Sequence, residues 1–125
     1  MEIQRDDDAM KLVNLCPHPI SLRHPDGTET VLPSEGNARV SVDYRQARTI
    51  ELGGHAVPVI EGKYGMVAGL PEPEEGCIYV VSHMVRMALP QRADLWSPAD
   101  MIRDASGTVV ACRMFEATMR TETKA

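Results

Sequence analysis

A cysteine and a histidine stand two residues apart in the segment Cys16, Pro17 and His18. Alternate side chains of extended backbone share a face, so the thiol and the imidazole would lie on the same side. A cysteine beside a histidine is the minimum for a thiolate nucleophile, and His18 with Asp94 or Cys16 would serve a small hydrolase or transferase. The structural alternative is a rigid crossing fixed by Pro17 and Pro19, in which the ring packs or caps a backbone group. We favour that alternative and predict no catalytic residue.

The second candidate for chemistry is the start of a short predicted helix at Ser82. The first amides of a helix lack partners inside it and attract anions, and Arg86 follows one turn later. Arg39, Arg92 or Arg103 would add bidentate contacts to a phosphate or carboxylate. The alternative is that Ser82 is an ordinary cap and that Arg86 pairs with Asp94 or a loop glutamate. The predicted ligand-binding residues are Arg39, Ser82, Arg86, Arg92 and Asp94.

The third candidate is the charged segment from Arg92 to Pro98, which contains the chain's one tryptophan, Trp96. Trp and Arg dominate the energetics of protein interfaces, so this segment is a candidate recognition loop. The alternative is a structural pair between Arg92 and Asp94, with Trp96 closing the edge of the core.

No metal or cofactor site is predicted. The four histidines lie at positions 18, 24, 55 and 83, and their spacing does not bring three or four ligands together as a zinc site requires. The sequence also has no Gly-rich phosphate loop and no Ser, His and Asp ordering typical of a hydrolase.

Composition indicates one domain. The chain has 125 residues, of which 43% are hydrophobic and 4% aromatic, so the core must be aliphatic and rich in methionine. We expect a single domain over residues 10–117, between a flexible acidic leader (1–9) and a flexible tail (118–125).

Charge and cysteine content limit the partners and the compartment. The net charge of −5 argues against a surface for duplex nucleic acid. Three widely spaced cysteines indicate reduced thiols rather than a disulfide framework. No apolar run reaches the eighteen residues that span a bilayer, so we expect no membrane partner and a cytoplasmic location in the host cell.

The nine glycines and nine prolines separate short apolar runs, as in β structure. Residues 20–22 and 28–32 alternate around an Asp-Gly turn, which predicts a hairpin. Residues 38–42 form another predicted strand. Residues 49–52 and 56–60 predict a hairpin across Gly53 and Gly54, and a further strand pair would add residues 65–68 after a turn at 62–64.

The segment from Cys77 to Val81 is apolar at nearly every position, which suits a strand covered on both faces. A helix capped by Ser82 and stopped by Pro90 follows, with Met84 and Val85 on its apolar face and Arg86 on its polar face. Residues 91–98 are expected to form a loop and residues 108–115 a final strand. The predicted fold is mainly β, a twisted antiparallel sheet or small half-open barrel with one short helix.

A longer pattern resembles an uncharacterised family of small proteins encoded in bacteriophages and prophages. The pattern covers about Leu12 to Arg113, and its polar positions indicate where a shared site would lie. The matching residues are Leu12, Val13, Asn14, Leu15, Pro17, His18, Pro19, Ile20, Ala38, Arg39, Val40, Gly69, Leu70, Pro71, Tyr79, Val80, Val81, Ser82, Pro90, Arg92, Asp94, Leu95 and Pro98. The family usually has Thr in place of Cys16, which lowers the case for a catalytic thiol. We accordingly predict Asn14 and His18 as interaction residues, and we add Trp96 from the candidate recognition loop.

The resemblance implies a genomic setting and not a reaction. We expect a non-enzymatic binding protein, a homo-oligomer, that acts on a host protein or sequesters a small anionic, nucleotide-like ligand, in counter-defence against bacterial immunity. Two alternatives stay open: a small hydrolase or transferase that uses His18 with Asp94 or Cys16, and a structural or assembly protein of the virion.

Overall fold

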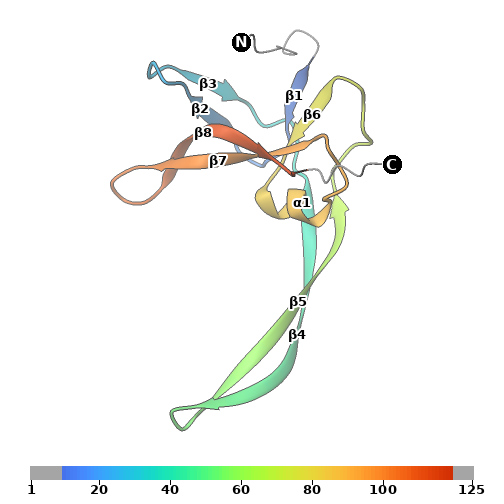
Figure 1. Ribbon diagram of the computed structural model, residues 1–125, viewed down its shortest axis with the longest axis vertical. Helices are drawn as coiled ribbons and strands as arrows, with labels where there is room; N and C mark the ends of the chain where they lie inside the picture. Colours follow the sequence, from blue (N-terminus) through green and yellow to red (C-terminus); the bar gives the residue numbers. More distant parts are fainter. Residues whose placement is uncertain (1–9, 120–125) are drawn as a thin grey trace.

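The computed structural model describes residues 10–119, and Figure 1 shows a β-rich body from which one long hairpin projects. The predicted leader (1–9) lies outside the described residues, as do residues 120–125 of the predicted tail. The elements of the described chain are β1 (Lys11–Asn14), β2 (Ile20–Arg23), β3 (Glu29–Leu32), β4 (Arg39–Leu52), β5 (His55–Ala68), β6 (Cys77–Val80), α1 (His83–Ala88), β7 (Leu95–Arg103) and β8 (Val109–Ala117).

The body is built on a six-stranded mixed sheet in the order β1-β6-β7-β8-β2-β3. Three neighbouring pairs are parallel, namely β1 with β6, β6 with β7 and β2 with β8. The parallel β2–β8 pairing is limited to a single register position, Leu22 opposite Cys112. The predicted mainly β class with one short helix is confirmed, as a mixed sheet and without a closed barrel.

Two apolar clusters form the core. Successive side chains of a strand point to opposite faces, so in β6 Tyr79 enters one cluster and Val80 the other. The first contains Leu15, Ala38, Cys77, Tyr79, Val81, Val85 and Leu95, and the second contains Cys16, Ile20, Val80 and Cys112. The helix is two turns at most, too short to be stable alone, and Val85 fixes it to the first cluster.

The long hairpin of β4 and β5 forms a separate two-stranded sheet, which we call the arm. Each strand has 14 residues, and Gly53 and Gly54 make the turn with φ of 55° and 82°. At about 3.3 Å per residue the arm is about 45 Å long. Val40 and Val67 anchor its base in the first core cluster beside α1, and the rest projects away from the body (Figure 1).

Two local expectations are confirmed. The Asp-Gly hairpin forms, with Ile20 opposite Leu32. The helix is capped by Ser82, whose side chain accepts a hydrogen bond from the Val85 amide at 3.2 Å.

Three other expectations are wrong. No turn interrupts residues 62–64, because β5 continues through them opposite β4. Residues 95–98 of the expected loop begin β7. On the helix, Met84 is 43% exposed whereas Arg86 is 2% exposed, so the two side chains exchange their predicted environments.

Candidate functional site

Arg86, predicted to bind an anion, is directed into the body. Its Nε donates to Ser97 Oγ at 2.9 Å, and its Nη1 donates to Thr118 Oγ1 at 2.8 Å. Its Nη2 donates to His83 Nδ1 at 3.2 Å and lies 3.3 Å from a Glu116 carboxylate oxygen. The guanidinium therefore connects the helix to β7, β8 and the start of the predicted tail.

Arg92 and Asp94 form a bidentate ion pair at the helix exit. Nε and Nη2 of Arg92 each donate to one carboxylate oxygen at 2.8 Å, and Nη2 also reaches the Pro71 carbonyl at 3.1 Å. Hydrogen bonding from Arg92 lowers the pKa of Asp94 below its ordinary value. This geometry matches the structural alternative of an Arg92–Asp94 pair, and the Pro71 contact connects the helix exit to the loop before β6.

The five predicted ligand-binding residues therefore fall into separate groups. Ser82 and Arg86 share the helix, Arg92 pairs with Asp94, and Arg39 is exposed on the first position of β4. Within residues 10–119, no hydrogen bond or ion pair joins one group to another.

Cys16 and His18 make separate contacts. The Cys16 thiol is buried and lies 3.9 Å from the Val80 carbonyl, and burial raises its pKa, opposite to the shift that a thiolate nucleophile needs. The His18 ring is exposed, with Nδ1 3.0 Å from the Pro19 carbonyl. In the described chain, neither Cys16 nor Asp94 is hydrogen-bonded to His18.

Asn14 and Trp96, both predicted interaction residues, have internal partners. Asn14 is fully buried, and its Nδ2 donates to the carbonyls of His18 and Leu32 at 3.0 and 2.9 Å. Its Oδ1 accepts from the Cys16 amide at 2.8 Å. Trp96 lies on β7 and packs against Phe115, with ring centroids 5.9 Å apart.

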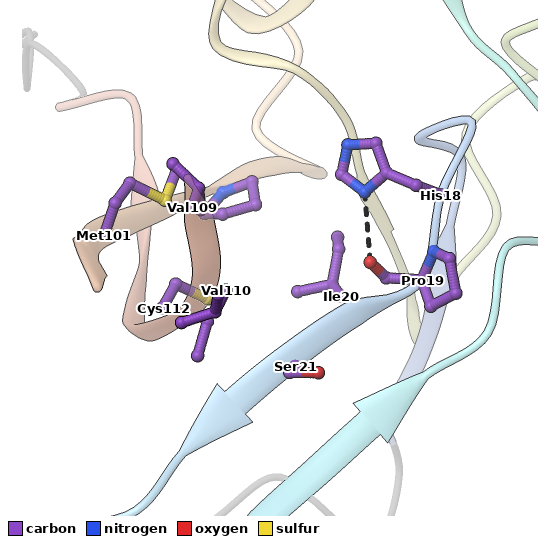
Figure 2. Close-up of a pocket in the computed structure, with 10 residues that line it drawn as sticks. His18, Pro19, Ile20, Ser21, Met101, Val109, Val110 and Cys112 are labelled. Atoms are coloured by element: carbon purple, nitrogen blue, oxygen red, sulfur yellow. Dashed lines mark hydrogen bonds between the residues drawn. The ribbon is translucent and has the colours of Figure 1, made fainter. Parts of the chain in front are cut away.

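A groove of about 490 Å³ lies between β2 and the β7–β8 hairpin, where the β2–β8 pairing is limited to one position. Figure 2 shows His18, Pro19, Ile20 and Ser21 on one side and residues of β7 and β8 on the other. The remaining lining residues are Pro98, Met101, Val109, Val110, Ala111 and Cys112. The lining is mostly apolar, with the His18 ring at one end.

The arm carries exposed apolar side chains on opposite faces of its two halves. In the half nearer the body, the pairs Val42–Tyr64, Tyr44–Gly62 and Gln46–Ile60 share one face, whereas Arg45–Glu61 and Asp43–Lys63 lie on the other. We define the proximal patch as Tyr44, Ile60 and Tyr64, which are 66%, 61% and 53% exposed.

In the outer half of the arm, the apolar side chains lie on the face of β5 opposite to the proximal patch. Val57 and Ile60 are three positions apart, and strand side chains an odd number of positions apart point to opposite faces. We define the distal patch as Ile50, Leu52 and Val57, in which Ile50 pairs with Val57 and Leu52 follows on the same face. Leu52 is 59% exposed, next to a turn whose two glycines contribute no side chains.

Residues 10–119 contain neither a cluster of metal-ligating side chains nor a membrane-spanning helix. No three His, Cys, Asp or Glu side chains of this range gather closely enough to hold an ion. No helix of this range has the length and apolar character needed to cross a membrane.

Comparison with known proteins gives no match: no family model, no curated protein and no solved structure resembles the chain significantly. The resemblance to phage and prophage proteins therefore stays a sequence-based prediction.

The sequence patterns did not predict the arm as one continuous hairpin, because they divided it among several short strands. The signal that could have found it is the alternation of apolar and polar residues at 42–45, 50–52 and 60–64, with Gly53 and Gly54 as the turn.

Proposed function

We propose that this chain is a non-catalytic binding protein that works by protein contact, and that the arm is its contact surface. One observation carries the proposal: the proximal patch exposes Tyr44, Ile60 and Tyr64 on one face of an amphipathic ribbon. Alternation of apolar and charged pairs is the pattern of a sheet with one buried face. An isolated two-stranded hairpin is marginally stable in water, so a partner that covers the apolar face stabilises the arm.

The chemistry of the proximal patch suits a protein partner. Tyrosines present large, rigid apolar rings together with a hydroxyl and are enriched in interface cores. The opposite face is polar, with the Arg45–Glu61 ion pair at 2.9 Å, and keeps the ribbon solvated on that side. A host protein is the partner class that the phage resemblance suggests, and counter-defence is the corresponding role.

Sequestration of a small anionic, nucleotide-like ligand is the second form of the proposal. Nε and Nη2 of Arg92 already donate to Asp94, so bidentate binding of the ligand by these two atoms requires the ligand to displace the Asp94 carboxylate. A panel of linear and cyclic nucleotides tests it by thermal shift. A rise in Tm with one nucleotide, absent in Arg92→Ala, supports this form, and no rise with any of them removes it.

A role in virion assembly is supported by a different observation. Both long edges of the arm are free within the described chain, because β4 and β5 pair only with each other. Free edges can accept a further strand from a neighbouring subunit. Purified particles that lack the protein would count against this role.

The experiment for the main proposal is a quantitative pull-down from host cells with matched variants. Tyr44→Ser together with Ile60→Ser changes the proximal patch, and Val31→Ser changes an exposed apolar residue (55%) on β3 instead. We expect the patch variant to lose partners that the wild type and the β3 variant both retain. Equal recovery by all three proteins would contradict the proposal.

A further inference from the structure

We propose that the distal patch of one copy packs into the groove between β2 and the β7–β8 hairpin of a second copy of this chain. The inference rests on the proposal that the arm is a contact surface, but it concerns different residues: the proximal patch is left free for another partner.

The surface area of the chain is large for its mass. It exposes 9530 Å², whereas a compact monomer of 13.8 kDa exposes about 6,600 Å². The fifteen residues outside the described range account for at most about 2,400 Å², the value for a fully unfolded segment of that size. We subtract these residues from the exposed area and also from the mass used for the compact monomer. The described chain then still exposes about 1,100 Å² more than a compact monomer of its size. A standard interface covers about 800 Å² per partner, so the excess is of the size that one interface would cover.

The arm cannot reach the groove of its own body. It leaves the body beside α1 and extends away from β2, β7 and β8, with its turn at the far end (Figure 1). The β4–β5 ladder is continuous from the base to Leu52 apart from two bulges, so the tip does not fold back. Contact between the distal patch and the groove is therefore intermolecular.

The shapes of the two surfaces correspond. The tip is narrow because Gly53 and Gly54 have open space around them, and Leu52 is the large apolar side chain next to the turn. The groove is lined mainly by apolar side chains, among which Met101 and Val109 are each 43% exposed. Insertion of Leu52 and Ile50 would remove apolar surface of both copies from water.

The net charges of arm and body do not oppose contact between an arm and a body. Residues 39–68 carry four basic and three acidic side chains, whereas the rest of the described chain carries six basic and ten acidic ones. Arm and body thus have net charges of opposite sign, and two arms have the same sign. If each arm enters the groove of the other copy, the assembly closes with two-fold symmetry and leaves no unpaired site.

Matched glutamate variants test the residues of the arm. Leu52→Glu is expected to raise the dimer dissociation constant at least about tenfold in sedimentation equilibrium. Met66→Glu makes the same type of change at an 84% exposed site near the base of the arm and is expected to leave the dissociation constant unchanged. Both positions are exposed, so neither change should prevent folding. A monomeric wild type, or a Met66 variant weaker than the Leu52 variant, would overturn the proposal.

Cross-linking tests the groove. Leu52→Cys protein is mixed with Met101→Cys protein, treated with a short bis-maleimide and analysed by peptide mass spectrometry. We expect links between positions 52 and 101 to exceed, by about tenfold or more, those formed when Met87→Cys on α1, which is 54% exposed, replaces the Met101 variant. Predominant 52–52 links would show arm-to-arm contact and overturn the proposal. If the variant with Tyr44→Ser and Ile60→Ser loses host-protein capture but still dimerises, the host protein and the second copy use different surfaces. The dimer proposal and the proposed function can therefore fail independently.

Discussion

The ring of Tyr44 lies over Gly62 across the two strands of the arm. A Cβ atom placed on Gly62 would lie 3.0 Å from Cε1 and 3.2 Å from Cδ1 of that ring. An aromatic ring opposite a strand glycine shields the exposed backbone and compensates for the missing side chain. This pair explains how a segment with Gly62 and Gly65 continues as a strand.

The Tyr44–Gly62 contact predicts the sensitivity of the arm to protease. Tyr44→Ala removes a cross-strand pair worth about 0.2–1 kcal/mol, so trypsin cleavage after Arg45 or Lys63 should accelerate, by up to about fivefold. Met66→Ala, which truncates a side chain that is 84% exposed, is the control and should leave the cleavage rate unchanged. Equal rates for the wild type and the Tyr44 variant would show that the ring does not stabilise the arm.

Arg86 is predicted to be required for stability. Arg86→Met keeps much of the apolar stem but leaves the buried Ser97 hydroxyl without its donor, and should lower the free energy of unfolding by about 2–4 kcal/mol. Urea denaturation measures the loss. Arg48→Met, an exposed change on the arm, should cost less than about 0.5 kcal/mol. A stable Arg86 variant that loses a ligand would instead favour the anion-binding interpretation.

Asn14 is predicted to hold the Cys16–Pro19 crossing in place. Asn14→Asp has the same shape, but a carboxylate cannot donate to the carbonyls of His18 and Leu32, and a charge would be buried. The free energy of unfolding should fall by more than about 3 kcal/mol at neutral pH. The exposed Asn37→Asp is the matched control. A small loss at Asn14, similar to that at Asn37, would contradict the hydrogen bonding described above.

The ion pair of Arg92 and Asp94 predicts a pH dependence. The folded state lowers the pKa of Asp94, so the carboxylate contributes stability that is fully present above its unfolded pKa of about 3.9 and is lost as the pH falls through the folded value. The stability difference between wild type and Asp94→Asn should therefore be constant from about pH 6 to 8 and shrink below about pH 4. Denaturant melts over this pH range measure it. A difference that grows at low pH would contradict the sign of the shift.

Turns and helix ends, which depend on a few neighbouring residues, were predictable from the sequence. Asp26 and Gly27 specify the β2–β3 turn, in which the Gly27 amide donates to the His24 carbonyl at 2.9 Å. Ser82 and Pro90 bound the helix because a cap and a stop each act within a few residues.

Features that depend on distant partners were not predictable. The parallel register of Lys11 opposite Cys77 joins segments far apart in sequence, and no local pattern encodes it. Helical periodicity assigns an arginine to the solvent face, but acceptors on β7 and β8 draw Arg86 inward. The glycines of residues 62–65 predict a turn from sequence alone. In the structure Tyr44 lies against Gly62 and Ser41 against Gly65, and the strand continues through them.

The most direct test of the arm as a contact between copies is amide hydrogen exchange of residues 50–57, the distal patch and its turn, measured on the wild-type protein at two concentrations about a hundredfold apart. An isolated ribbon of this kind is marginally stable, whereas a ribbon covered by a partner is protected. The account predicts slow exchange in these residues at high concentration and clearly faster exchange at low concentration, while the amides of β6 stay protected at both. Identical exchange of the arm at the two concentrations would contradict it.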